Sequence, residues 1–166
     1  MAKKKNSSMK FSTFVCQRAM RADLAADDKE GVIRELVGSL VESEAIKAGE
    51  VENIVKAILK REELGSTGIG RGVAVPHTKH ASVEKLVGTV GVSAAGIDFN
   101  SLDGEKVHIV FLLVSPPDRP GDHLRALESI SRQLRDDTFC RFLKQSKTAA
   151  DIQLLLEEAD HNQFAA

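Results

Sequence analysis

The sequence has few aromatic residues and no excess of either charge. It contains neither tryptophan nor tyrosine, and its aromatic content is limited to seven phenylalanines. The 166 residues carry a formal net charge of -1, and the only concentrated basic block is the lysine run at residues 3–5. Nucleic-acid binding relies on a dense basic surface and on aromatic stacking, so we expect no nucleic-acid partner.

Long hydrophobic runs and cysteines are equally scarce. The longest apolar run, residues 107–114, is far shorter than the roughly 20 residues of a membrane span. The apolar stretch near the start is broken by Ser12 and Thr13 and is too short for a signal-peptide core. Cys16 and Cys140 match no metal spacing and make no disulfide framework. We therefore expect a soluble, cytoplasmic protein with reduced thiols and no membrane insertion.

What the sequence does contain is an ordinary globular composition, with 42% hydrophobic and 28% charged residues, which suits one domain. Apolar residues recur at helical spacing over residues 32–41, after the acidic pair Asp27 and Asp28. A second helix is predicted over residues 51–61, with Gly65 ending the pattern.

The middle of the chain changes to short runs rich in β-branched residues, at residues 73–75, 86–92 and 107–114, which predict strands. The last run is apolar on both alternations, as in a central strand covered on both faces. Helices before and after these strands predict an α/β fold, a single domain with a mixed β-sheet flanked by helices.

Three further helices are predicted near the end of the chain. After the loop at residues 115–122, apolar spacing marks one helix up to Leu134. The next should be capped by Asp137 or Thr138, and Thr148 with Asp151 resembles a capping box for the last. We expect a basic tail over residues 1–19, one domain over 20–160 and a short tail over 161–166.

The stretch GSTGIGRGVAVPHTKH, residues 65–80, combines glycines with a histidine. The glycines leave backbone amides uncovered, which is how chains build cradles for anions. The spacing matches neither G-x-G-x-x-G nor a phosphate-binding loop, so a turn is the simpler interpretation. Pro76 holds Val75 extended and gives His77 a defined position, and a neutral imidazole can attack phosphorus directly.

Four other side chains are candidates for contacting a phosphoryl group. Arg61 could form a fork on its oxygens, and Ser66 and Thr67 offer hydroxyl donors. His123 lies in the first turn of its predicted helix, where an anion is favoured. The alternatives are a helix C-terminal charge for Arg61, turn formers for Ser66 and Thr67, and an exposed polar residue for His123.

The remaining histidines indicate neither a metal nor a cofactor site. His80 follows His77 by three residues, but no further ligands stand at zinc-like spacing. His108 alternates within an apolar strand and is expected to be a hydrogen-bonded core histidine. We expect no metal and no cofactor.

The run REELGSTGIGRGVAVPHTK, residues 61–79, resembles the signature of the fructose/mannitol-type enzyme IIA domain of the bacterial phosphotransferase system. The resemblance continues through DHLRALESISRQL, residues 122–134, and covers roughly residues 20–160. It implies a mixed sheet flanked by helices. It also implies that His77 accepts phosphate on Nε2 from the phosphorylated histidine carrier protein. His123 would support it, and Arg61 with the hydroxyl of Thr67 or Ser66 would flank the phosphoryl group.

The same resemblance leaves the role open between two members of the family. No IIB or membrane IIC segment is fused here, which favours the nitrogen-regulatory type acting on target proteins. The alternative is a separately encoded fructose/mannitol enzyme IIA that passes phosphate to a IIB domain for sugar uptake. An alternative of another class is a regulatory binding module controlled by phosphorylation of His77.

Overall fold

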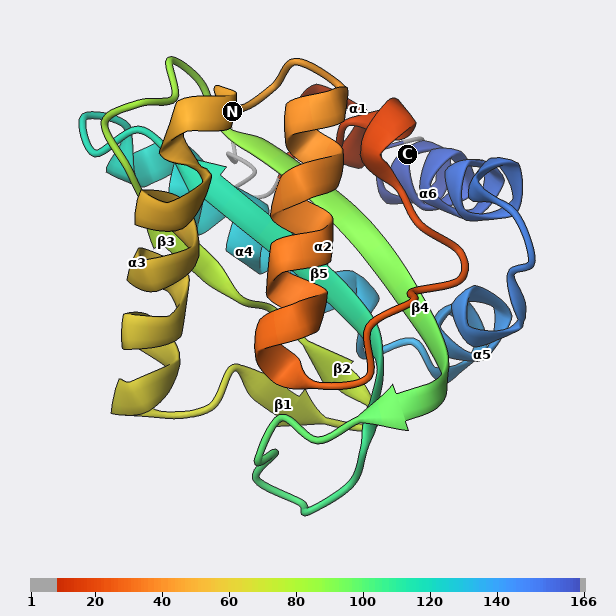
Figure 1. Cartoon of the computed structure of the whole chain (residues 1–166). Coiled ribbons are helices and arrows are strands. Elements are labelled where there is room, and N and C mark those ends of the chain that lie inside the picture. Colours follow the sequence, from red (N-terminus) through yellow and green to blue (C-terminus); the bar gives the residue numbers. More distant parts are fainter. Residues whose placement is uncertain (1–8, 165–166) are drawn as a thin grey trace.

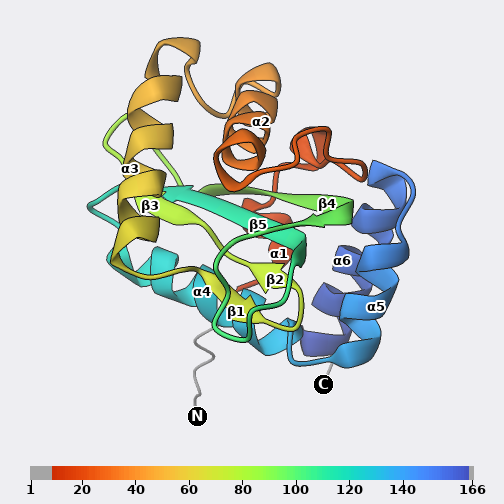
Figure 2. The ribbon, with the colours of Figure 1, turned by 60° about the horizontal axis from the view of Figure 1, so that its bottom comes forward.

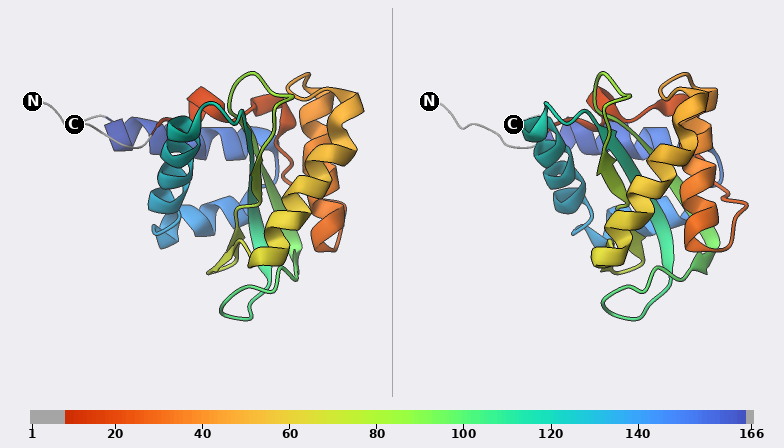
Figure 3. Two further views of the ribbon diagram at one scale, coloured as in Figure 1. Left: turned by 90° about the vertical axis from the view of Figure 1, so that its left-hand side faces the viewer. Right: turned by 60° about the vertical axis from the view of Figure 1, so that its left-hand side comes forward.

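A mixed β-sheet lies between two layers of helices in the computed structural model, which describes residues 9–164 (Figure 1). Figure 3 shows the sheet edge-on, with α2 and α3 against one face and α4, α5 and α6 on the other side. Each interface has its own hydrophobic cluster. The predicted fold class, a single α/β domain with a mixed sheet flanked by helices, is confirmed.

The sheet is organised around β5 (Val107–Ser115). One edge of β5 pairs antiparallel with β4 (Val87–Ile97). The other edge pairs in parallel with β2 (Val73–Ala74) and then β3 (His77–Lys79), which follow one another along it. β1 (Gly68–Gly70) pairs antiparallel with β2. β5 is therefore the central strand.

Side chains of β5 alternate between the two hydrophobic clusters, because successive residues of a strand point to opposite faces. The face packed against α4, α5 and α6 carries Ile109, Phe111 and Leu113. The face packed against α2 and α3 carries Val110, Leu112 and Val114. All six are at most 1% exposed. The prediction of a strand covered on both faces is confirmed.

The helices α2 (Lys29–Glu42) and α3 (Val51–Leu64) form the first layer. The Asp28 carboxylate caps α2 by accepting a hydrogen bond from the Gly31 amide at 2.7 Å. A single 3-10 turn, η2 (Ala48–Glu50), leads into α3. Gly65 follows the last residue of α3, as the sequence predicted.

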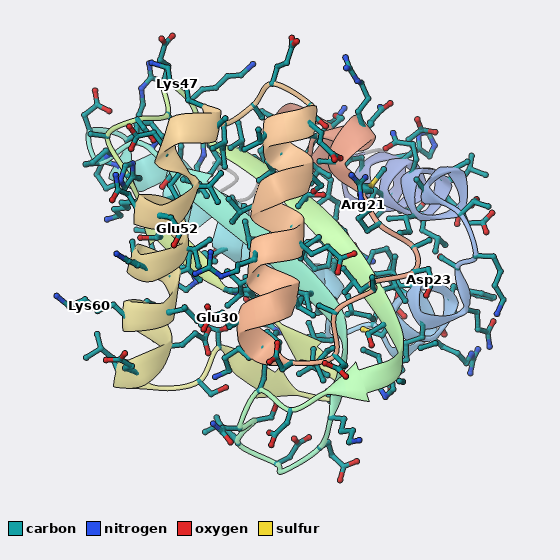
Figure 4. The ribbon with its side chains drawn as sticks, in the orientation of Figure 1. Arg21, Asp23, Glu30, Lys47, Glu52 and Lys60 are labelled. Atoms are coloured by element: carbon teal, nitrogen blue, oxygen red, sulfur yellow. The ribbon has the colours of Figure 1, made fainter. Side chains whose placement is uncertain are left out.

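A surface ion-pair network joins these two helices. Arg34 on α2 pairs with Glu30 of its own helix at 2.9 Å and with Glu52 of α3 at 2.5 Å. Figure 4 shows Glu30 and Glu52 on adjacent helices, whereas Lys60 extends away from both. Exposed ion pairs contribute little each, so burial of the apolar faces is the main stabilising term.

The second layer contains α4 (Pro120–Gln133), α5 (Asp137–Gln145) and α6 (Ala149–Phe164). Asp136 caps α5, one residue before the predicted caps, because its carboxylate accepts hydrogen bonds from the Thr138 and Phe139 amides. Within residues 9–164, no helix combines the length and apolarity needed to cross a membrane.

The predicted capping box before α6 is present. The Asp151 amide donates to the Thr148 hydroxyl at 3.1 Å, and the Asp151 carboxylate accepts from the Thr148 amide at 3.2 Å. This reciprocal pair satisfies two amides that the helix itself leaves without partners.

The N-terminal segment differs from the expected tail over residues 1–19. Residues 1–8 lie outside the described part of the chain, but the helical turns α1 (Phe11–Phe14) and η1 (Gln17–Ala19) pack against the domain. Phe11 is 1% exposed, and its amide donates to the Asp160 carboxylate at 2.6 Å. Burial of this aromatic ring and its hydrogen-bonded backbone attaches the segment to the core.

The same segment also covers the outer edge of β4. The amides of Cys16, Arg21 and Leu24 donate to carbonyls of this strand at 2.8 to 3.0 Å. These bonds satisfy an edge that would otherwise be open to other chains. At the other end, α6 continues to Phe164, past the domain boundary expected at residue 160.

Candidate functional site

A break between β2 and β3 sets the position of His77. Proline has no N–H, and the Pro76 carbonyl accepts a hydrogen bond from the Leu113 amide at 3.1 Å. The Val75 amide turns away from β5 and donates to the Thr67 carbonyl at 3.1 Å. Pairing with β5 resumes at His77, opposite Leu113. The proline thus places the imidazole at the first residue of a short strand.

The His77 ring has one nitrogen held and one nitrogen free for chemistry. Its Nδ1 lies 2.7 Å from the Val75 carbonyl oxygen, which can only accept, so Nδ1 carries the hydrogen. In the neutral ring the lone pair is then on Nε2. The side chain is half-buried. Burial is the main cause that lowers the pKa of His77 below its ordinary value, so the neutral form predominates at pH 7.

Nearby charges adjust the same equilibrium. The positive charges of Arg61 and Lys79 also lower the pKa of His77. The bond to the Val75 carbonyl and the charge of Glu62 act in the opposite direction. Both kinds of charge therefore lie close enough to act on the ring.

His123 lies in the first turn of α4, as predicted, but is 5% exposed and so is not the exposed polar residue of the alternative interpretation. Its Nδ1 lies 2.5 Å from the hydroxyl oxygen of Ser115, the last residue of β5. Burial first, and the charges of His77 and Lys79 next, lower the pKa of His123 to about 4. The ring is neutral at pH 7.

The two histidine rings lie side by side, although 46 positions separate them in the sequence. Their centroids are 5.3 Å apart and their planes are inclined by 57°. Because each Nδ1 is engaged by a neighbouring residue, each Nε2 remains available to a ligand. The structure thus brings together the two histidines that the sequence singled out.

The glycine stretch forms less of a turn than the sequence indicated. Residues 68–70 form β1, and the reversal is confined to Gly70, Arg71 and Gly72, which all have positive φ angles of 98°, 62° and 81°. The stretch therefore contributes a strand and a tight turn at the end of the sheet away from β3.

Ser66 and Thr67 use their hydroxyl protons within the protein. The Ser66 hydroxyl donates to the Phe99 carbonyl, and the Thr67 hydroxyl donates to the Glu62 carboxylate. Each hydroxyl has a single proton to donate. In this arrangement a phosphoryl group would compete with these acceptors for the hydroxyl protons. Both residues instead shape the segment between α3 and β1.

Arg61 lies at the end of α3 and is half-buried. Its Nη1 donates to the Gly65 carbonyl at 2.9 Å, which stabilises the end of the helix. This is the C-terminal interaction that the sequence left as the alternative. The guanidinium has five N–H donors, so this bond does not exhaust it.

Sequence reasoning missed Glu62, which organises this segment. The residue is 7% exposed, and its carboxylate accepts from the Thr67 amide at 3.2 Å and pairs with Lys29 at 3.1 Å. A signal was present, because position 62 continues the apolar helical face of Ile54 and Ile58. A carboxylate on such a face needs partners.

Ser115 was also missed. It is fully buried, and it continues the odd-numbered positions of β5 that face α4. Its hydroxyl has only the His123 ring as a recorded side-chain partner among the described residues. Strand alternation could have placed it toward α4, but nothing in the sequence indicated a histidine there.

The other two histidines in this part of the chain have separate partners. The Nδ1 of His80 lies 2.7 Å from the Ser82 hydroxyl, and the Nδ1 of His108 lies 2.9 Å from the Ser93 carbonyl. Among residues 9–164, no three His, Cys, Asp or Glu side chains gather in a way that could hold a metal ion.

Comparisons with known proteins place this arrangement in context. Residues 14–159 match the family described as phosphoenolpyruvate-dependent sugar phosphotransferase system, EIIA 2. A nitrogen regulatory protein of Bradyrhizobium diazoefficiens is 36% identical over 149 residues, which cover 89% of this chain and 95% of that protein.

A sugar-specific relative and a solved structure show the same similarity. The fructose-specific EIIABC component of Bacillus subtilis is 32% identical over 152 residues, 92% of this chain but 24% of that protein. The crystal structure of nitrogen regulatory protein IIA-Ntr from Neisseria meningitidis superposes with a TM-score of 0.78 at 25% identity, covering 88% of this chain and 98% of that one.

Proposed function

Because this chain belongs to the EIIA 2 family of the phosphoenolpyruvate-dependent sugar phosphotransferase system, we propose that it is a phosphocarrier with His77 as its phosphorylated residue. The donor would be the phosphorylated histidine carrier protein. The observation that supports this most directly is the hydrogen bond from His77 Nδ1 to the Val75 carbonyl. It leaves the Nε2 lone pair of a neutral, half-exposed ring as the nucleophile.

The proposed step moves a phosphoryl group between two imidazoles. The Nε2 lone pair of His77 attacks the phosphorus of the donor phosphohistidine in line, and a new N–P bond forms. The donor's N–P bond breaks, and its electron pair returns to the donor ring, which takes up a proton. The His77 Nδ1–H keeps its bond to the Val75 carbonyl throughout, so the ring need not reorient.

His123 would stabilise the transferred group. We infer that the buried Ser115 hydroxyl donates to Nδ1 of His123, which would leave the hydrogen of this neutral ring on Nε2. At a ring separation of 5.3 Å from His77, that N–H could donate to a phosphoryl oxygen. The nearby charges of Arg61 and Lys79 would offset the charge of the transferred group.

We favour the regulatory role for the phosphorylated protein. The 36% identical relative, which this chain covers almost entirely, is named a nitrogen regulatory protein. The acceptors would then be regulatory target proteins in the cytoplasm. The alternative is a separately encoded fructose/mannitol enzyme IIA that passes phosphate to a IIB domain, because this chain also matches part of a fructose-specific component.

The relay is tested by incubating the protein with phosphoenolpyruvate, the first enzyme of the system and the carrier protein. We expect one acid-labile phosphoryl group in the wild type and none in His77→Ala. His80→Ala is the matched control, since His80 lies three residues away with its own Ser82 partner. Label retained in His77→Ala, or lost in His80→Ala, would contradict the assignment.

The regulatory role is tested by comparing the partners of the phosphorylated and unphosphorylated forms. A regulator should capture target proteins in one form and lose them in the other, because phosphate adds charge and acceptor oxygens to the interface. A sugar-transport component should instead transfer its label rapidly to a fructose-type IIB domain. Rapid transfer together with an unchanged set of captured proteins would favour the transport role.

A further inference from the structure

A polar hollow lies at the opposite end of the sheet from His77. Figure 2 brings this end forward, where β1, β2, the loop between β4 and β5, and α5 meet. The hollow has a volume of about 770 Å³ and is open to solvent. The charged residues that line it are four cations and two carboxylates, namely Arg71, Lys106, Arg141 and Lys144, and Glu105 and Asp137.

The charge of this hollow differs in sign from that of the whole protein. The six residues give it a formal charge of +2, whereas the chain carries -1. Arg71 is paired with Asp137 across the hollow. Among the described residues, no ion pair involves Lys106, Arg141 or Lys144. Three cations outside any ion pair therefore line the hollow, together with the carboxylate of Glu105.

The floor of the hollow is uncharged and suited to close approach. The Lys144 ammonium lies 3.2 Å from the point where a side chain would begin on Gly72, and the His108 ring lies 3.7 Å from that point. Because glycine has no side chain here, the ammonium reaches the backbone. His108 Nδ1 is engaged by the Ser93 carbonyl, which leaves Nε2 for a ligand. Burial raises the pKa of the Cys140 thiol, so this residue adds no negative charge.

The backbone holds Arg71 in an unfavourable conformation at the rim of the hollow. Its φ of 62° lies in the left-handed region, which is unfavourable for a residue with a side chain. The Arg71 amide donates to the Asp103 carboxylate at 3.1 Å, which fixes this conformation. Strain of this kind concentrates at ligand clamps, and here it directs the guanidinium toward α5.

We propose that this hollow binds a small phosphate-bearing metabolite with at least two negative charges. Arginine forks and lysine ammonium groups are the usual partners of phosphate oxygens, and the uncharged floor accommodates the body of a small molecule. Such a ligand would compete with Asp137 for Arg71.

The site is separate from the phosphoryl-transfer site. Val73 at the near end pairs with Ile109, and His77 pairs with Leu113, so the two sites are four residue steps apart along β5. This corresponds to about 13 Å along the sheet. Phosphate binding here therefore does not depend on the proposed role of His77.

Titration with pyrophosphate, followed by calorimetry and by amide chemical shifts at low ionic strength, tests the proposal. We expect saturable binding to the wild type and shifts at Gly72, His108 and α5. Removal of one charged contact in Lys144→Ala or Arg141→Ala should weaken binding about tenfold. Both side chains are exposed, so these substitutions should leave the far-ultraviolet circular dichroism spectrum unchanged.

Two matched variants separate this site from its surroundings. Lys147→Ala removes an exposed lysine just beyond α5 and outside the hollow, and should leave the affinity unchanged. His77→Ala should also bind pyrophosphate normally, whether or not His77 is phosphorylated in the cell. Absence of saturable binding, equal affinity in Lys144→Ala and Lys147→Ala, or shifts confined to the surroundings of His77 would overturn the proposal.

Discussion

The buried His123 ring should make the stability of the fold depend on pH. His123 is 5% exposed, and its pKa is lowered from 6.5 to about 4, first by burial and then by the charges of His77 and Lys79. Below pH 6.5 the unfolded chain binds a proton at this position, whereas the folded chain does not until the pH approaches 4. The stabilising contribution is therefore present above pH 6.5 and is lost as the pH falls toward 4.

The size of this effect follows from the shift. Each pKa unit corresponds to about 1.4 kcal/mol, so a shift of about 2.5 units bounds the loss at about 3 kcal/mol. Between pH 7 and pH 5 the expected loss is about 2 kcal/mol, because most of that interval lies between the two pKa values. In His123→Asn the proton cannot bind, and this part of the pH dependence should disappear.

Urea denaturation of both proteins at pH 7 and pH 5 measures the effect. We expect the free-energy difference between wild type and His123→Asn to shrink by about 2 kcal/mol at the lower pH. The same comparison in a His77→Asn background removes the charge of the neighbouring ring, whose pKa is also lowered by burial. A free-energy difference that stays constant with pH would refute the argument that His123 is buried in its neutral form.

Three substitutions test other contacts. Ser115→Ala should slow phosphoryl acceptance about tenfold and cost about 1–2 kcal/mol in stability, because the buried Nδ1 of His123 loses its partner. Ser115→Thr should restore the rate. A wild-type rate in the alanine variant would exclude a positioning role. Asp160→Ala should lower the free energy of unfolding, measured with urea, by about 2 kcal/mol, because the Phe11 amide loses its acceptor. An unchanged free energy of unfolding would mean that the N-terminal segment is held by packing alone. Glu62→Gln should lower the free energy of unfolding by about 2 kcal/mol, whereas Glu63→Gln should leave it nearly unchanged, since only the Glu62 carboxylate is buried. Equal effects of the two substitutions would contradict the stabilising role of the Glu62 contacts.

The parts of the fold that the sequence predicted are those specified by local patterns. The run at residues 107–114 is apolar on both alternations because β5 has a helical layer on each face. The longer helices were recognised by apolar spacing and polar caps, with an error of one residue at Asp136. The short strands β1 and β3 carry no such pattern, because they form only where β2 and β5 offer an edge for pairing. The buried N-terminal segment was missed for the same reason, since its partners Asp160 and β4 are distant in sequence.

The candidate site shows the same division between local and long-range information. Pro76 and His77 stand next to each other, so an imidazole held in a defined position could be proposed from residue types alone. The proximity of His123 depends on the register of β3 against β5 and on the start of α4. The partners of Ser66 and Thr67 depend on residues before and after the loop, namely Phe99 and Glu62, and no pattern in the loop predicts them.

The electrostatics of the site would favour a phosphoryl group over a proton on His77. Burial and the charges of Arg61 and Lys79 lower the pKa of the ring, so Nε2 keeps its lone pair at pH 7. The same positive charges would attract the negative oxygens of a phosphoryl group attached to that nitrogen. A carrier must also release its group, and tight multiple hydrogen bonds would oppose release. Because the Ser66 and Thr67 hydroxyls are already committed within the protein, the group would be held mainly by charge and by His123, which suits a residue that is loaded and unloaded in turn.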